Sequence, residues 1–187
     1  FNSFSNTLDA YQFKGRSLHL DLVHKYEFSS NFQLITGLNY QEHSNYSVTP
    51  FAVIDKEIAN FNTIDPYASF VYISDKGLSV NLGGRYNIHN VYGNQLVYDG
   101  NTAYNFDLNE ENSIKVLASY STAFIAPSLY QLYDGFSGNI DLNPESNETI
   151  EAGFEYRFKD WFSMDAVYFK RTETDAIVYD NLTYKYQ

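Results

Sequence analysis

The stretch Ser119–Phe158 reads SYSTAFIAPSLYQLYDGFSGNIDLNPESNETIEAGFEYRF, and it determines the fold class. Apolar and polar residues alternate before and after a long aromatic segment that contains Gly and Pro. The second half shows the alternation best, because Ile150, Ala152, Phe154 and Tyr156 alternate with Glu151, Gly153, Glu155 and Arg157. A period of two residues is typical of β-strands with one apolar and one polar face. The stretch therefore predicts two strands joined by a long loop.

The composition of the 187 residues is rich in aromatic side chains. Hydrophobic residues make up 44% of the chain, yet these include 18 Tyr and 15 Phe, and the mean hydropathy is negative. Lipid-facing barrels combine aromatic girdles with a polar interior and fit this balance. A Tyr-rich soluble β-sandwich fits the composition equally well, so composition alone leaves both open. Strong alternation without a break in composition favours a single domain.

Charge and missing motifs exclude several classes of protein. The net charge of −11 argues against nucleic acid binding, because phosphate neutralisation needs clustered Lys and Arg. Without cysteine, the chain has no disulfide and no thiolate metal site. No apolar run approaches the roughly 20 residues of a membrane helix. The segment Phe1–Gly15 lacks the apolar core of a signal peptide, which indicates a mature chain or an internal piece.

The same alternation recurs along the whole chain and predicts eight strands, with no helix of consequence. Several are about as long as the 9–11 residues that a tilted strand needs to cross a bilayer. The predicted strands are Ser17–Glu27, Phe32–Gln41, Tyr67–Ser74, Leu78–Ile88, Thr102–Leu108, Ser113–Ala123, Glu148–Phe158 and Phe162–Asp175.

The predicted connections alternate between short and long. Short polar turns are expected at Ser29–Asn31, Asp75–Gly77, Asn109–Asn112 and Lys159–Trp161, and long connections at Asn45–Asp65, His89–Asn101 and Phe124–Asn147. A helical turn is conceivable at Val53–Asn60. Outer-membrane barrels alternate short periplasmic turns with longer external loops, whereas Greek-key sandwiches break this pattern. The rhythm therefore favours an all-β, antiparallel transmembrane barrel over a soluble sandwich.

Three phrases in the long loop resemble the TonB-dependent outer-membrane receptors. They are Thr122–Leu129 (TAFIAPSL), the pair Leu132-Tyr133, and Gly138–Glu145 (GNIDLNPE), followed by the Glu-containing strand start Glu148–Gly153. Gln131–Tyr133 and Asp175–Tyr186 are similar to cobalamin receptors of this family. The specific matches cover about a third of the chain. One departure is Asn139-Ile140, where many members have Asn-Pro.

This resemblance implies an outer-membrane receptor of a Gram-negative bacterium that imports a scarce, bulky nutrient. Cobalamin is the first expectation, and a siderophore or haem is the alternative within the family. Such a barrel has about 22 strands around a plug. Residues 1–187 would supply about eight of them, without the plug through which TonB acts and without the C-terminal strands. Partners would be the bulky ligand, TonB and the lipid bilayer. A complete eight-stranded outer-membrane structural or adhesion protein is the competing hypothesis.

Aromatic residues of the expected long loops are the candidate ligand-binding residues, because they offer large contact area at small entropic cost. The candidates are Tyr130, Tyr133, Asp134 and Phe136 in the longest loop, Tyr46 and Phe51 in another, and Tyr92 and Tyr98 in a third. Girdle or loop packing is the competing interpretation for each. On the polar strand face, Arg85 is expected to point into the lumen.

Enzymatic chemistry is not predicted. The histidines are scattered, none forms a two-His metal spacing, and no Gly-x-Ser-x-Gly elbow occurs. Asp134, Asp141 and Glu145 share a loop without the spacing of an EF-hand, so a solvated loop is expected there rather than a calcium site. The sequence therefore predicts no catalytic residue, no metal and no cofactor.

Overall fold

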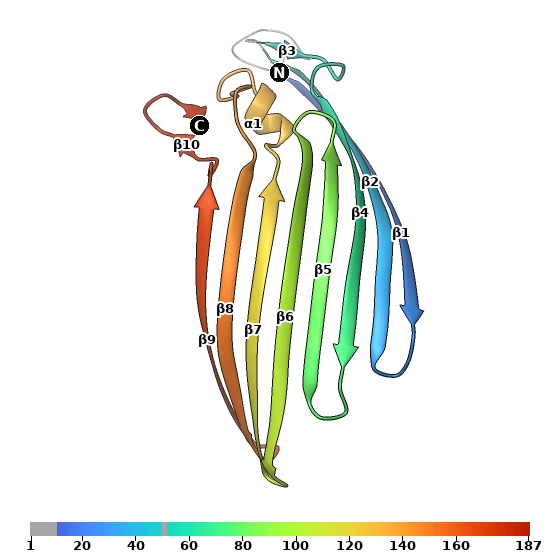
Figure 1. Cartoon of the computed structure of the whole chain (residues 1–187). Coiled ribbons are helices and arrows are strands. Elements are labelled where there is room, and N and C mark those ends of the chain that lie inside the picture. The colour runs from blue at the N-terminus through green and yellow to red at the C-terminus, as the bar shows by residue number, and fades with distance from the viewer. Residues whose placement is uncertain (1–10, 50–51) are drawn as a thin grey trace.

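The computed structural model describes residues 11–49 and 52–187, and it consists almost entirely of long antiparallel strands (Figure 1). The strands are β1 (Gln12–Glu27), β2 (Phe32–Val48), β3 (Val53–Ile54), β4 (Asn60–Ile73), β5 (Leu78–His89), β6 (Gly93–Asn109), β7 (Asn112–Ile125), β8 (Glu145–Phe158), β9 (Phe162–Thr174), β10 (Tyr179–Asp180) and β11 (Lys185–Tyr186). One short helix, α1 (Leu129–Tyr133), lies in the longest loop. The eight predicted strands are confirmed, most of them longer than expected.

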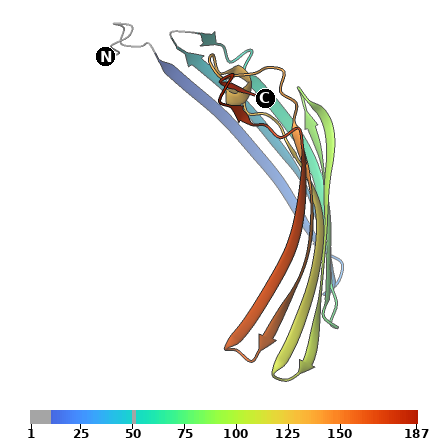
Figure 2. The same cartoon turned by 90° about the vertical axis from the view of Figure 1, so that its left-hand side faces the viewer.

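The long strands form one sheet in the order β1-β2-β4-β5-β6-β7-β8-β9, with the short β3 paired to β2. Each long strand pairs with its neighbour along the chain, so the topology is a meander. In the described residues the path is open, because the edge strands β1 and β9 do not pair with each other. The sheet is strongly curved, with a convex and a concave face (Figure 2). A two-sheet sandwich is therefore excluded for this part of the chain.

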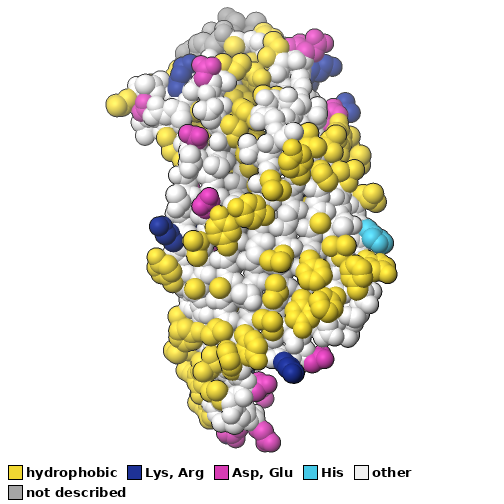
Figure 3. Space-filling model, in the orientation of Figure 1, with side chains coloured by type: hydrophobic (Ala, Val, Ile, Leu, Met, Phe, Trp, Pro, Cys, Tyr) yellow, Lys and Arg dark blue, Asp and Glu magenta, His cyan; other side chains and the backbone are white. Residues whose placement is uncertain are grey.

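The period of two residues places apolar side chains on the convex face. Directly opposed residues share a face, as Phe70 of β4 does with Leu82 of β5. Leu22 is 71% exposed and Leu82 is 56% exposed. Figure 3 shows this face with apolar side chains spread along the strands and few charges between them. Such a large exposed apolar surface needs a non-aqueous neighbour.

Aromatic rings gather on this face near the short turns. The ring centroids of Phe32 and Tyr72 lie 4.6 Å apart, and those of Tyr26 and Phe28 also lie 4.6 Å apart. Trp161, in the turn between β8 and β9, lies edge-on to Phe158 at 5.7 Å. Rings at this level are typical of the aromatic girdle of a membrane barrel.

The concave face carries the polar half of the alternation. Tyr67 lies across Gly37 of the neighbouring strand, because a Cβ at Gly37 would meet the Tyr67 ring. The Tyr67 hydroxyl donates to Asp21 at 3.3 Å, and the Arg85 guanidinium lies 5.4 Å from the ring centroid. Arg85 therefore lies on the concave wall, as the sequence predicted.

The two ends of the sheet differ. Residues 28–31, 74–77, 110–111 and 159–161 make short turns at one end, which we call the short-turn end. At the other end, which we call the loop end, the strands are connected by residues 90–92, by residues 126–144 and by the connection 49–59, of which 49 and 52–59 are described. Among the described residues, the few buried apolar side chains lie at the loop end and include Ala59, Pro127, Leu132 and Leu142.

One predicted long connection is wrong. His89–Asn101 was expected as a loop, but β5 ends at His89 and β6 begins at Gly93, so only residues 90–92 connect them. Gly93 enters β6 with a φ of 75°, which suits glycine in a tight turn. The sequence of this segment predicted a loop because most of its concave-face residues, such as Gln95, Asp99 and Asn101, are polar. Its Gly100 also fits beneath Leu82, where a Cβ would lie 3.3 Å from a Leu82 methyl carbon.

Two smaller expectations need adjustment. Val53–Asn60 forms β3 and then a single hydrogen-bonded turn, in which the Ala59 amide donates to the Asp55 carbonyl at 2.9 Å. Helix α1 was not predicted, although its signal is present. Ser128 and Gln131 form a capping box, the Ser-x-x-Gln pattern that starts a helix. None of the described helices has the length and hydropathy to span a membrane.

Candidate functional site

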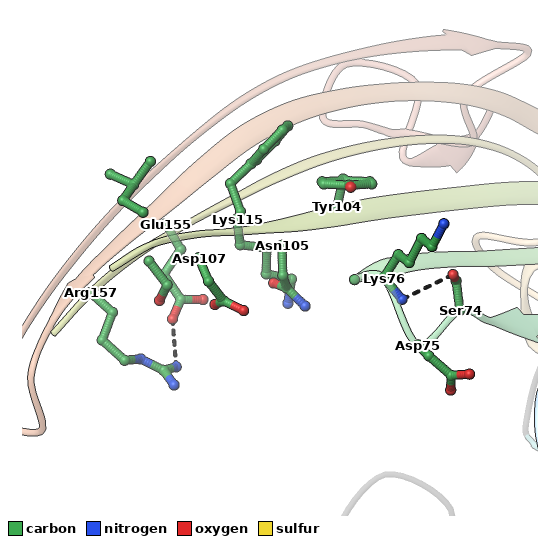
Figure 4. A pocket seen from close by; sticks show the side chains of 13 residues that line it. Ser74, Asp75, Lys76, Tyr104, Asn105, Asp107, Lys115, Glu155 and Arg157 are labelled. Carbon is green, nitrogen blue, oxygen red and sulfur yellow. Dashed lines mark hydrogen bonds and ion pairs between the residues drawn. The ribbon is translucent and has the colours of Figure 1, made fainter. Parts of the chain in front are cut away.

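Two hollows of the concave face lie at opposite ends of the sheet. The larger, about 850 Å³, lies at the short-turn end and is lined by charged side chains from the turn 74–77 and from β6, β7 and β8 (Figure 4). Lys76, Asp107, Lys115 and Glu155 surround it, and Arg157 pairs with Glu155 at 2.7 Å. Tyr104, Phe106 and Leu108 also line this hollow, but charged and polar side chains predominate in its wall, which suits a ligand with flat apolar faces poorly.

The second hollow, about 510 Å³, lies at the loop end, and we call it the loop-end pocket. Its wall consists mainly of concave-face residues of β1, β2 and β4, and its other side is the start of α1. It is lined by Phe13, Gly15, Arg16, Ser17, His43, Ser44, Asn45, Phe61, Ser128, Leu129 and Tyr130. Its size and its mixture of rings with a few polar groups are typical of a small-molecule site.

A row of four rings begins in the wall of this pocket, with His43 and Phe61, and continues beyond it. The centroids of His43 and Phe61 lie 4.8 Å apart, those of Phe61 and His89 5.0 Å, and those of His89 and Tyr92 5.1 Å. We call these residues the ring row. They come from β2, β4, β5 and the following turn, so sheet pairing alone aligns residues that are far apart in sequence.

Hydrogen bonds fix the two imidazoles of the ring row. His43 Nδ1 lies 3.2 Å from Ser17 Oγ, and its Nε2 lies 3.2 Å from Gln41 Oε1. His89 Nδ1 accepts from the amides of Val91 and Tyr92 at 3.1 and 3.3 Å. The rings are therefore held in position before any ligand arrives, which lowers the entropic cost of binding.

The loop 126–144 folds inward over the concave face and carries α1 with it (Figure 2). Ser128 caps the helix, since its hydroxyl accepts from the Gln131 amide while the Gln131 side chain accepts from the Ser128 amide. At Gly135 a Cβ would lie 2.8 Å from the Cβ of Ala52, so this loop packs against the connection 49–59. The contact between Gly135 and Ala52 therefore joins two connections that are distant in sequence.

Asp134 is the C-cap residue of α1 and does not line the loop-end pocket. Its Oδ2 accepts from the Ser137 hydroxyl at 2.8 Å and from the amides of Ser137 and Phe136 at 2.9 and 3.1 Å. Partial burial opposes ionisation, but these bonds outweigh it and hold the pKa of Asp134 below its ordinary value. The carboxylate is thus a structural element of the loop, and we do not propose it as a ligand contact.

The C-terminal segment packs against the same loop. Strands β10 and β11 form a hairpin, in which the Tyr186 amide donates to the Ser137 carbonyl at 3.1 Å. Asn139 Nδ2 donates back to the Tyr186 carbonyl at 2.9 Å, and the Tyr130 ring lies edge-on to Tyr186 at 6.3 Å. Hydrogen bonds and ring contacts therefore fix the position of the loop from two sides.

Three of the predicted residues reach the loop end as expected. Tyr130 is 55% exposed at the rim of the loop-end pocket. Phe136 is 67% exposed beside Tyr184. Tyr133 is half-buried close to Tyr92, and burial together with Tyr133 raises the pKa of the Tyr92 phenol. Tyr92 was expected in a long loop; it lies instead in the short turn 90–92, at the end of the ring row.

The remaining aromatic candidates do not join the site. Tyr46 and Tyr98 were predicted to lie in loops, but they are strand residues of β2 and β6 on the convex face. The Lys14 ammonium nitrogen lies 5.8 Å from the centroid of the Tyr46 ring, and the ring centroids of Tyr98 and Tyr120 lie 5.9 Å apart. Strand extension beyond the expected ends explains both errors. Phe51 lies outside the described residues.

The sequence interpretation did not find His43, Phe61 and His89. They occupy concave-face positions near the loop ends of three neighbouring strands, so only the register of the sheet brings them together. Selecting the polar-face residues that lie close to the predicted long connections would have identified them from sequence. Among the described residues, no group of three or more His, Asp or Glu side chains is suited to holding a metal ion.

Comparisons with known proteins agree with this architecture. The family model for the TonB-dependent receptor-like β-barrel matches residues 1–187. The vitamin B12 transporter BtuB of Vibrio cholerae serotype O1 is 29% identical over 140 residues, which are 73% of this chain and 21% of the transporter. The chain thus spans about a fifth of the length of the curated relatives it matches.

Two solved structures share the fold. The siderophore receptor PirA of Pseudomonas aeruginosa superposes with a TM-score of 0.72 at 22% identity, over 97% of this chain and 35% of PirA. A variant of the ferric enterobactin receptor PfeA from the same organism, in complex with enterobactin, gives a TM-score of 0.69 at 17% identity. That match covers 89% of this chain and 28% of PfeA. At these identities the likeness concerns the fold.

Proposed function

The chain belongs to the TonB-dependent receptor β-barrel family, and from this premise we propose that it forms part of an outer-membrane receptor that imports cobalamin. The family consists of receptors and transporters, so the proposed activity is uptake, in which no covalent bond is made or broken. The observation that carries the proposal is the loop-end pocket, which combines preorganised rings with an apolar lining. A bulky corrinoid presents flat and apolar surfaces that such rings contact well.

The convex face supports a position within the outer membrane. Strands of 12 to 17 residues, at about 3.3 Å per residue, extend beyond the roughly 25 Å apolar band of a barrel wall. The aromatic residues near the short turns then lie at one membrane interface. In this orientation the short-turn end faces the periplasm and the loop end faces the medium, from which a nutrient would enter.

The polar concave face would line the lumen of the receptor. By the family resemblance, a plug occupies this space and passes energy from TonB to the ligand site. The charged hollow at the short-turn end then lies on the plug side, and the loop-end pocket lies on the ligand side. This division explains why the larger hollow is not the proposed ligand site.

A siderophore or haem is the second candidate ligand. PirA is a siderophore receptor and PfeA is a ferric enterobactin receptor, but their likeness to this chain concerns the fold alone. The vitamin B12 transporters are more similar in sequence, at 29% identity against 22% and 17% for the two solved structures. The competing eight-stranded barrel is disfavoured, because β1 and β9 remain unpaired with each other in the described part of the chain.

Ligand titration of the full-length receptor in detergent tests the proposal. We expect cyanocobalamin to bind with a dissociation constant below about 1 μM, an affinity worth more than about 8 kcal/mol. A ferric siderophore and haem, titrated in parallel, should bind far more weakly. Binding of either one in place of cyanocobalamin would overturn the choice of ligand while keeping the receptor assignment.

The same titration locates the site. Replacing Phe61 with Ala removes the ring that joins His43 to His89, and we expect affinity to fall by about tenfold or more. Phe70→Ala is the matched control, because it removes the same ring from the convex face of the same strand. Equal losses in the two variants would show that the loop-end pocket is not the ligand site.

A further inference from the structure

At His89 of the ring row and next to it, the concave wall contains buried side-chain atoms that have no hydrogen-bond partner among the described residues. They are Thr63 Oγ1, Asn87 Oδ1 and His89 Nε2. Thr63 is 6% exposed and His89 is 4% exposed. Because a buried polar atom without a partner costs stability, three of them within one small area need an explanation.

The three atoms belong to neighbouring positions of one face. Thr63 of β4 lies directly opposite His89 of β5 in the ladder. Asn87 lies two residues before His89 on the same strand and therefore on the same face. Opposed Cα atoms are about 5 Å apart, and alternate residues on a strand are about 6.6 Å apart. One small molecule between them can reach all three side chains.

The hydrogen bonds around the cluster define what each atom offers. His89 Nδ1 accepts from two backbone amides, so the proton of the neutral ring is on Nε2, which is a donor. Asn87 Nδ2 donates to Asp65 Oδ1 at 2.7 Å, which fixes the amide and leaves Oδ1 as an acceptor. The Thr63 hydroxyl can donate or accept. The cluster thus presents one donor, one acceptor and one group of either kind.

This combination excludes ions. A metal cation needs a bare imidazole nitrogen, but Nε2 carries the proton. An anion would meet the carboxylate of Asp65, which is 2% exposed and bonded to Asn87 within the same cluster. A neutral molecule that both donates and accepts hydrogen bonds remains, and water is the smallest of these.

We propose that Thr63, Asn87 and His89 bind one structural water molecule. The water accepts from His89 Nε2, donates to Asn87 Oδ1 and shares one bond with Thr63 Oγ1, which gives the three bonds typical of a buried water. It fixes the second edge of the His89 ring, whose first edge is held by the amides of the turn 90–92. This site does not depend on the identity of the transported nutrient.

A crystal structure of the full-length receptor, at a resolution that shows ordered waters, tests the proposal directly. We expect a density peak within about 3 Å of His89 Nε2, Thr63 Oγ1 and Asn87 Oδ1. Absence of a peak where neighbouring waters are visible would overturn the proposal. A peak with the anomalous signal and short ligand distances of a metal would overturn it as well.

Thermal unfolding of Thr63→Val gives an independent test by the sign of its effect. If water is bound, valine removes one of its partners, and the melting temperature of the full-length receptor falls by a few degrees. If the hydroxyl has no partner, valine replaces it with a methyl group of similar size, and the melting temperature stays or rises. The latter result would contradict the proposal.

Thr149→Val is the matched control, since Thr149 is a half-buried residue on the same face of the sheet in β8. It should change the melting temperature less than Thr63→Val does. Should Thr63→Val fail to yield folded receptor, the density in the unmodified receptor decides the question.

Discussion

At the scale of single residues, the concave wall depends on close packing between neighbouring strands. Tyr67 fits across Gly37, and this position orients the ring for its contacts with Asp21 and Arg85. Sequence alternation predicted which face Arg85 occupies, because alternate residues of a strand point to opposite faces of the sheet. It could not predict the Tyr67 contact with Gly37, because this contact depends on the register between β2 and β4.

Gly37→Ala tests this packing. The added methyl group would meet the Tyr67 ring, which must move and lose its contacts with Asp21 and Arg85. We expect the free energy of unfolding of the full-length receptor to fall by about 1–3 kcal/mol, measured by urea unfolding in lipid vesicles. Gly15→Ala is the control, since a Cβ there has no neighbouring atom within 4 Å. Equal effects of the two changes would contradict the packing argument.

At the scale of elements, the loop 126–144 is a small folded unit rather than a flexible connection. The capping box at Ser128, the buried Leu132 and the bonds to Asp134 each hold part of it. The sequence predicted the boundaries of this loop well, because Gly and Pro punctuate it. It missed the direction of the loop, since inward folding depends on contact with the connection 49–59.

The same reasoning explains which candidate residues were found. Tyr130 and Phe136 were identified because aromatic residues in a long loop are conspicuous in sequence. The ring row was missed because its members are separated along the chain and meet only through pairing of β2, β4 and β5. Tyr98 was misplaced because polar residues and glycine in β6 mimic a loop.

Acidification should loosen this loop through Asp134. Its pKa is lowered in the folded protein, so its bonds stabilise the loop fully above the ordinary value of 3.8, and this contribution is lost as pH falls through the folded pKa. Asp134→Asn should remove most of this pH dependence. Hydrogen exchange of the Phe136 and Ser137 amides, corrected for the intrinsic rate, measures the effect between pH 6 and about pH 3.

The expected result is a loss of protection of about fivefold to tenfold on acidification, corresponding to about 1 kcal/mol. Asp141→Asn serves as the control, because the Asp141 carboxylate takes no part in these bonds. If the Asp134→Asn receptor loses protection on acidification as steeply as the unmodified one, another group is responsible.

At the scale of the whole molecule, the sheet has an apolar convex side and a polar concave side, but few buried apolar residues among those described. Fold class, strand number and the alternation of faces were predictable from sequence, because each follows from a period of two. Closure could not be predicted from the chain alone. The described strands form an open wall whose two edges need further partners.

Leu82→Arg tests the orientation of the convex face. Leu82 lies on that face near the middle of the sheet and is 56% exposed. A charge facing hydrocarbon at mid-depth costs about 2–4 kcal/mol, so we expect a corresponding loss in the free energy of folding into lipid vesicles. Leu82→Met keeps the position apolar and should be nearly neutral. If Leu82→Arg is also nearly neutral, the convex face does not contact lipid.

The bonds between the loop 126–144 and the hairpin of β10 and β11 have an evolutionary consequence. Ser137 and Asn139 each bond to the backbone of Tyr186, so the two segments present a single composite edge at the loop end. A receptor under selection for a new nutrient would have to replace both segments together. Natural variants should therefore exchange them as one inherited cassette, with recombination breakpoints in β7 and beyond β11 rather than in β8.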